Sequence, residues 1–194
     1  MIRTNIINKL ASEINAQTYL EIGVRDHHLN FDKINIANKI SVDPHVHDRE
    51  PSYKMTSDDF FKQNKDTFDI IFIDGLHESE YVERDINNSL KVLNDNGFII
   101  CHDMNPTSKE MQIVPPIQNT WTGDCWKAWV RTRSLNPNVK MFVVNTDCGC
   151  GVIQKGAQQL LDTKGLELTY ENLNSNREEW LNLISVDDFL KAQL

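Results

Sequence analysis

Short apolar runs alternate along the chain with longer segments in which apolar residues recur every three or four positions. The short runs predict strands at 18–24, 39–43, 69–74, 98–102, 139–145 and 150–154. Residues 70–73 and 98–100 are all Ile or Phe, which is typical of strands in a parallel sheet. These runs therefore predict a sheet that is covered on both faces.

The longer segments predict helices. The clearest lies at 78–93, where Val82, Ile86, Leu90 and Leu93 fall on one face. Other helices are expected over 2–14, 30–38 and 123–134, and after Ser57, which is expected to cap an acidic first turn. Three prolines make 106–120 a long loop, and such loops are often lids or binding loops.

The order of these elements predicts the fold class. Strands and helices alternate through most of the chain, and the last two strands are separated only by a short turn. This order predicts an α/β fold with a Rossmann-like, doubly wound, mostly parallel sheet and an antiparallel edge strand. No linker or repeat interrupts the 194 residues, so we expect one domain over 1–194. The apolar tail around Trp180 is expected to dock on the chain's own core or on a second subunit of a homo-oligomer.

Composition and charge narrow the classes of partner. The hydrophobic content of 40% and charged content of 25% are ordinary for a globular protein, and the N-terminus has no secretory pattern. A net charge of −8 disfavours binding to nucleic acid or to an anionic membrane. We therefore expect a cytoplasmic protein that acts on a small molecule. The spacing of the four cysteines does not fit a structural zinc site, so we expect reduced thiols.

Acidic and histidine side chains follow the two Ile- and Phe-rich strands. Asp74 and His77 follow one strand, and His102 and Asp103 end the other. Ligands bind outside the carboxyl ends of strands in open α/β sheets, so these four side chains are expected in one crevice. The remaining histidines follow the first two strands: His27, His28, His45 and His47.

These side chains have more than one chemical interpretation. The carboxylates could share a divalent cation, or they could orient the histidines by hydrogen bonds. His77 is the candidate general base towards a hydroxyl, and its alternative role is capping or packing. Asp43 ends the second strand, where it would bind a ribose diol or act as a turn residue before Pro44.

Four segments resemble the successive motifs of class I S-adenosylmethionine-dependent methyltransferases, namely 19–24, 41–44, 69–77 and 97–103. The likeness covers about residues 17–155 and extends to a small bacterial group with an IDGxH strand end, which is associated with glycan or natural-product pathways. It implies a single methyltransferase-like domain with S-adenosyl-L-methionine as cofactor. Glu21 and Gly23 would lie beside the methionine part, Asp43 would bind the ribose, and Ser57 and Asp58 would lie near the adenine.

Resemblance to the metal-dependent O-methyltransferases of the catechol and macrolide-sugar types implies a divalent metal, magnesium or manganese. Asp74, His102 and Asp103 stand at the metal-binding positions. The metal would hold a substrate hydroxyl near the methyl group, and His77 would remove its proton, which makes His77 and Asp74 the catalytic candidates.

The chain departs from the family pattern in the turn after the first strand. No further glycine follows Gly23 over residues 24–29, although a glycine-rich turn lets the backbone approach the cofactor closely. Bulky side chains there would obstruct or reshape the methionine pocket. Residues 121–126, with two Trp and Asp124, are expected to form a wall that suits a sugar. The alternative is that Trp126 and Trp129 are core residues of a helix, which is the favoured interpretation for Trp129.

The sequence therefore predicts a methyltransferase that acts on the hydroxyl group of a small molecule, with a sugar of a glycan or natural product as the expected class. One alternative is a metal-dependent hydrolase or lyase that uses the same histidines and acids without the cofactor. The other is a non-catalytic member of the fold that binds a ligand.

Overall fold

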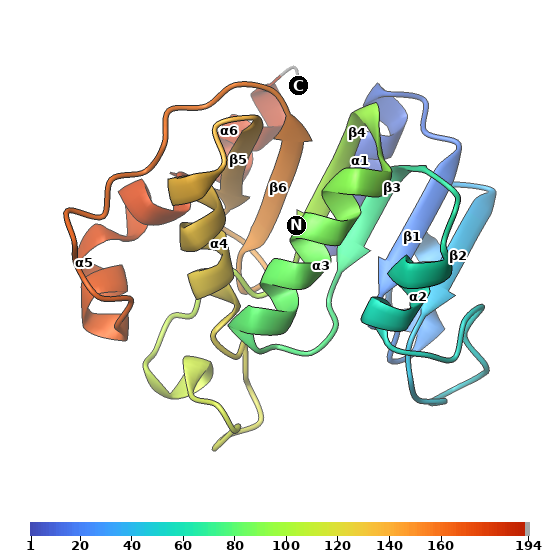
Figure 1. The fold of residues 1–194 in the computed structure, drawn as a ribbon, viewed down its shortest axis with the longest axis horizontal. Helices are drawn as coiled ribbons and strands as arrows, with labels where there is room; N and C mark the ends of the chain where they lie inside the picture. The colour runs from blue at the N-terminus through green and yellow to red at the C-terminus, as the bar shows by residue number, and fades with distance from the viewer. Residues whose placement is uncertain (193–194) are drawn as a thin grey trace.

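A seven-stranded sheet runs through the middle of the molecule, with helices on both faces (Figure 1). This computed structural model describes residues 1–192. The strands are β1 (Thr18–Ile22), β2 (Asn38–Val42), β3 (Phe68–Ile73), β4 (Leu93–Cys101), β5 (Val139–Val144), β6 (Cys150–Lys155) and β7 (Leu183–Ile184). Their order across the sheet is β2-β1-β3-β4-β6-β5-β7.

The sheet is parallel except at one strand. β1 pairs in parallel with β2 and β3, and β3 pairs in parallel with β4. β6 runs antiparallel to both of its neighbours, β4 and β5, and the short β7 pairs in parallel with β5. The expected Rossmann-like, mostly parallel sheet is therefore confirmed, and its antiparallel pairing lies toward the β7 edge.

Each face of the sheet carries its own apolar layer. In β3, Ile71 and Ile73 pack on one face and Ile70 and Phe72 on the other, as alternating strand side chains must. The first face is covered by α2 (Ser57–Gln63), α3 (Ser79–Val92), α4 (Cys125–Leu135) and α5 (Tyr170–Leu181). The second is covered by α1 (Arg3–Glu13), the 3-10 turns η1 (His27–Leu29) and η2 (Phe31–Lys33), and α6 (Val186–Lys191).

The helix expected over 30–38 is wrong: the two 3-10 turns η1 and η2 stand between β1 and β2 instead. Phe31, Ile34 and Ile36 are nevertheless buried, as the pattern required. The Lys39 ammonium donates hydrogen bonds to the carbonyls of Phe31 and Ile34 at 2.8 and 3.2 Å. The Phe31 carbonyl also accepts the Ile34 N–H at 3.3 Å, the spacing of a 3-10 turn, and the extended backbone of Ile34 ends that turn.

The apolar tail packs on the chain's own core. Trp180 in α5 is buried and stacks on Trp126 of α4, with ring centroids 6.2 Å apart. The Trp129 indole donates a hydrogen bond to the Leu181 carbonyl at 3.2 Å. Within residues 1–192, no helix has the length and apolar character needed to cross a membrane.

Candidate active site

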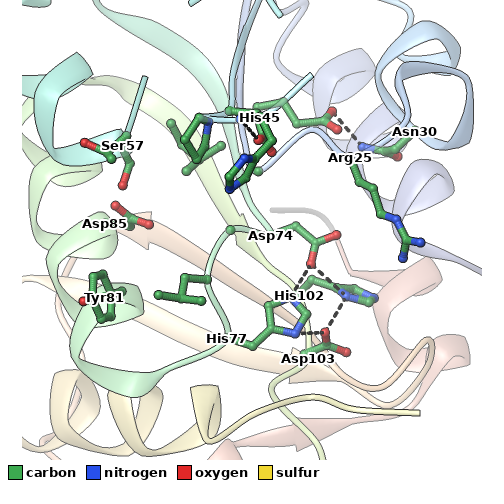
Figure 2. A pocket seen from close by; sticks show the side chains of 18 of the residues that line it. Arg25, Asn30, His45, Ser57, Asp74, His77, Tyr81, Asp85, His102 and Asp103 are labelled. Atoms are coloured by element: carbon green, nitrogen blue, oxygen red, sulfur yellow. Dashed lines mark hydrogen bonds and ion pairs between the residues drawn. The ribbon is translucent and has the colours of Figure 1, made fainter. Parts of the chain in front are cut away.

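A cavity of about 690 Å³ opens at the carboxyl edge of the parallel strands (Figure 2). All of the site residues expected from the sequence line it: Glu21, Gly23, Asp43, Ser57, Asp58, Asp74, His77, His102 and Asp103. A volume of this size lies in the range of cavities that hold cofactors and small molecules. The parallel register of β1 to β4 is what brings residues so far apart in sequence to one cavity.

His77 is held on both ring nitrogens and on one face. Its Nε2 lies 3.2 Å from Asp74 Oδ1, within hydrogen-bond distance. Its Nδ1 lies 3.2 Å from Asp103 Oδ2, at an angle that makes no hydrogen bond, and this nitrogen is buried. The ring stacks on Trp121, with centroids 5.2 Å apart and planes 26° apart. The imidazole orientation is thus fixed by two acids and an aromatic ring.

His102 lies beside the same two acids. Its Nδ1 is 3.3 Å from Asp74 Oδ1 and 3.2 Å from Asp103 Oδ2. Its Nε2 is 3.5 Å from Asp147 Oδ2 and 2.6 Å from the Arg3 guanidinium. Asp103 itself has a left-handed backbone, with φ of 63°, which is uncommon outside glycine and recurs at functional sites.

Arg3 and Asp147 were not expected in the site. Arg3 begins α1, and its backbone N–H donates to Asp147 Oδ2 at 2.9 Å. Asp147 stands in the turn between β5 and β6, which reaches the site because β6 pairs with β4. The sequence marked that turn as tight but held no signal that it would lie against His102.

The charges of the cluster stabilise one another. Burial alone would raise the pKa of Asp74, but the positive charge of His102 and the hydrogen bonds from both histidines hold it well below its ordinary value. Burial alone would lower the pKa of His77 and of His102, but Asp74 outweighs it and raises both. A hydrogen bond from His102 lowers the pKa of Asp147 to about 2. Each imidazole is therefore easier to protonate than a free histidine.

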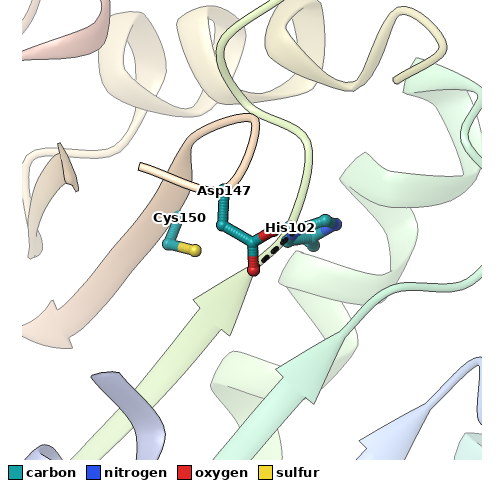
Figure 3. A group of neighbouring side chains, drawn as sticks. All are labelled: His102, Asp147 and Cys150. Carbon is teal, nitrogen blue, oxygen red and sulfur yellow. Dashed lines mark ion pairs between the residues drawn. The ribbon is translucent and has the colours of Figure 1, made fainter. Parts of the chain in front are cut away.

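The donor set at the end of β3 and β4 fits a divalent cation. Asp74, His102 and Asp103 each offer an atom, and these atoms lie within 4.8 Å of one another. Two carboxylates and one imidazole suit magnesium less well than manganese, iron or zinc. A second set, His102, Asp147 and Cys150, shares His102 with the first (Figure 3). Burial raises the pKa of Cys150 to about 12, so the thiolate that a metal needs is disfavoured there.

The other end of the cavity offers groups that suit a nucleoside. Asp43, at the end of β2, accepts a hydrogen bond on Oδ1 from the His45 backbone at 2.7 Å. None of residues 1–192 bonds its second oxygen, so that oxygen is available to a ribose diol. Asp58 is less available, because Arg84 donates to its carboxylate at 2.9 Å. Ser57 is the first residue of α2, and the helix is capped by Thr56 rather than by Ser57 as expected, because the Thr56 hydroxyl accepts the Asp59 N–H.

The turn after β1 does not obstruct the cavity. Val24 is buried in the core beside α1, and the buried His27 ring lies 2.8 Å from Asp48 Oδ1. Of residues 24–29, only Arg25, Asp26 and Leu29 line the cavity. Gly23 has a φ of 84°, and a Cβ on it would lie 2.3 Å from the Asp74 carbonyl oxygen. The glycine is thus required by the loop that carries Asp74.

The expected aromatic wall is only partly correct. Trp121 lines the cavity, whereas Trp126 is fully buried against Trp180. Asp124 accepts the Ser79 N–H at 2.7 Å and so serves the start of α3 rather than the cavity. Gly123, with φ of 58°, packs directly on the His77 backbone, so a Cβ at this position would overlap the His77 carbonyl.

Comparison with known proteins agrees with this geometry. Residues 15–104 match a family described as a methyltransferase domain. A comparison with curated proteins gives no match. The fold is similar to that of cofactor-bound Rv0187 from MTB, with a TM-score of 0.61, 12% identity and 80% of each chain covered.

Two further solved structures have the same fold. One is the SAH-bound Podospora anserina methyltransferase PaMTH1, with a TM-score of 0.56, 18% identity, and 77% of this chain and 76% of that chain covered. The other is the O-methyltransferase from Bacillus cereus in complex with SAH, with a TM-score of 0.53, 14% identity, and 81% and 82% covered. The resemblance found in the sequence is thereby confirmed: residues 15–104 match the methyltransferase-domain family, and the fold is the one seen in these solved methyltransferases.

Proposed function

We propose that the protein is an S-adenosylmethionine-dependent O-methyltransferase that acts on a small hydroxylated molecule, a sugar of a glycan or natural product. The methyltransferase family match supports this class of enzyme, and two proteins of similar fold were crystallised with SAH. The cavity supports it further, because a carboxylate suited to ribose lies at one end and a histidine–acid cluster at the other.

The observation that carries the proposal is the placement of His77 between Asp74 and Asp103. Asp74 lies within hydrogen-bond distance of Nε2 and fixes the orientation of the ring in the cavity lining. In this position the His77 imidazole accepts the proton of the substrate hydroxyl. Trp121 holds the ring plane while this happens.

Residues of the cavity would hold two groups. Glu21, Gly23 and Asp43 would bind S-adenosylmethionine, which would supply an electrophilic methyl group on sulfur. Asp74, His102 and Asp103 would hold a divalent cation, magnesium or manganese, which would lower the pKa of the substrate hydroxyl. The chain's own contribution is to orient the acceptor against that methyl group and to take its proton at His77.

Calorimetric titration with S-adenosylhomocysteine tests the proposal first. We expect saturable binding, and no binding at millimolar concentration would contradict the function. In a protein that binds, His77→Ala is expected to lower kcat by about 10²–10⁴-fold with cofactor affinity retained. His28→Ala is the matched control, since His28 is exposed and outside the cavity lining. Equal losses of turnover and cofactor affinity in His77→Ala would argue against a general base.

The two alternatives predict other outcomes of the same titration. A hydrolase or lyase would bind the metal but not S-adenosylhomocysteine, and a non-catalytic member would bind a ligand without turnover. A cytoplasmic location, assembly into a homo-oligomer and the lack of nucleic-acid or membrane partners remain predictions from the sequence.

A further inference from the structure

We infer that Arg25 binds the carboxylate of the methionine part of the cofactor, in place of the close backbone approach of a glycine-rich turn. The inference rests on the proposed function, because it requires S-adenosylmethionine in the cavity. It goes beyond that function by assigning an anion-binding role to a residue in the turn where the chain departs from the family pattern.

Arg25 stands at the methionine end of the cavity. It follows β1 by three positions, and its exposed side chain lines the cavity together with Asn30 (Figure 2). Glu21 lines the same cavity. Gly23 and Val24 do not compete for this space, since one packs on the Asp74 loop and the other in the core. The guanidinium is therefore the group that the turn presents to a ligand.

Four of the other five basic side chains of the cavity, all but His45, already have partners. The full set is Arg3, Arg25, His45, His47, His77 and His102. His77 and His102 face Asp74 and Asp103, and Arg3 lies against His102. His45 and His47 follow β2, where His47 lies 3.9 Å from Asp43 at the ribose end. Within residues 1–192, Arg25 makes no ion pair and no side-chain hydrogen bond, so its charge is available to an external anion.

The chemistry of the cofactor matches this arrangement. Its methionine end carries a carboxylate and an ammonium group a few bonds apart. A planar guanidinium can bind a carboxylate through two parallel hydrogen bonds. The acidic side chain of Asp26 lines the same wall and suits the ammonium group. The wall therefore offers opposite charges to the two ends of one amino acid.

The test compares two ligands that differ only in the amino-acid part. S-adenosylhomocysteine carries the carboxylate, whereas 5′-methylthioadenosine keeps the nucleoside and the thioether but lacks the amino acid. Both are titrated by calorimetry into the wild type, Arg25→Ala and Arg25→Lys. We expect Arg25→Ala to weaken S-adenosylhomocysteine binding by about 10–100-fold and to leave 5′-methylthioadenosine binding unchanged. Arg25→Lys should fall between wild type and Arg25→Ala for the first ligand only.

Arg49→Ala is the matched control. Arg49 is an exposed arginine that pairs with Asp32 outside the cavity lining, so both affinities should be unchanged. An Arg25→Ala variant that keeps the wild-type affinity for S-adenosylhomocysteine overturns the inference and leaves the proposed function standing. Equal weakening of both ligands also overturns it, because the effect would then be structural.

Arg3→Ala provides the remaining comparison. If Arg3→Ala, and not Arg25→Ala, removes the preference for S-adenosylhomocysteine over 5′-methylthioadenosine, Arg3 binds the carboxylate and the inference is wrong. A wild type that binds neither ligand contradicts the proposed function itself, and the inference with it.

Discussion

Replacing Gly23 by alanine tests how the turn after β1 and the loop that carries Asp74 fit together. Gly23 has a φ of 84°, a conformation that costs an L-residue about 1–2 kcal/mol. The added Cβ would also lie 2.3 Å from the Asp74 carbonyl oxygen and 2.4 Å from Gly75 Cα. Ordinary contacts begin at 3.4 Å, so the loop must move by about 1 Å.

Two consequences follow from that displacement. Overpacking of this kind costs about 1–3 kcal/mol, so Gly23→Ala is expected to lower the free energy of unfolding by about 2–5 kcal/mol in total. A shift of about 1 Å in a residue beside the reacting atoms costs about 100-fold in turnover. Asp74 would move relative to His77 and His102, and cofactor affinity would fall as well because Gly23 lines the cavity.

Gly165→Ala is the control that separates the steric overlap of the added Cβ from the cost of a positive φ in an alanine. Gly165 has a φ of 72°, but a Cβ on it would meet no atom within 4 Å. The free energy of unfolding of Gly165→Ala should therefore fall by only the conformational cost of about 1–2 kcal/mol, and the variant should keep full turnover. Urea unfolding gives the two free energies, and initial rates give the turnover. The reasoning is refuted if Gly23→Ala is no less stable than Gly165→Ala, or if it retains wild-type turnover.

Three further outcomes are expected. Asp103 helps to raise the pKa of His77 above 6.5, so an NMR titration of the His77 ring should show a midpoint above 6.5 that falls in Asp103→Asn; an unmoved midpoint would contradict the charge coupling. Burial raises the pKa of Glu21 from 4.5 to about 7, so the folded state prefers the neutral acid, and stability should fall by up to about 3 kcal/mol as pH rises from 4.5 through 7. Urea unfolding of Glu21→Gln should lack this slope, and an equal slope in both proteins would show that another group causes it. Manganese titration should find one site in the wild type and none in Asp103→Asn, whereas retained binding in the variant would place the metal elsewhere.

The sequence predicted the strands, and the meeting of the candidate site residues in one cavity, for one physical reason. Runs such as 70–73 are apolar because both faces of the sheet are covered, and that pattern is local in the chain. Once the strands are parallel, the residues that follow them must meet at one edge. Asp43, Asp74, His77 and His102 could therefore be placed together before their distances were known.

The parts that the sequence did not predict depend on contacts between distant segments. Arg3 reaches His102 only because α1 docks on the sheet, and no local pattern marks it. In place of the helix expected over 30–38, Lys39 from beyond the segment bonds the Phe31 carbonyl, and the Asn30 side chain bonds Glu21 of β1. Trp126 was assigned to the cavity wall, but burial against Trp180 depends on where α5 packs.

No glycine follows Gly23 over residues 24–29, but the cavity is open beside this turn. The lack of a glycine-rich turn therefore changes how the cavity is kept open. In this turn, buried polar side chains fix the backbone: Asn30 donates to Glu21 at 3.0 Å and accepts from Thr4 at 2.7 Å. His27 lies 2.8 Å from Asp48 and 3.3 Å from Ser41, which ties the turn to β2 and to the loop after it. A conformation fixed by such bonds tolerates an arginine that faces the cavity, because its backbone need not approach the ligand. The cofactor would then be held at this end by a side-chain charge, and its affinity would depend on salt more steeply than in a site built from backbone amides.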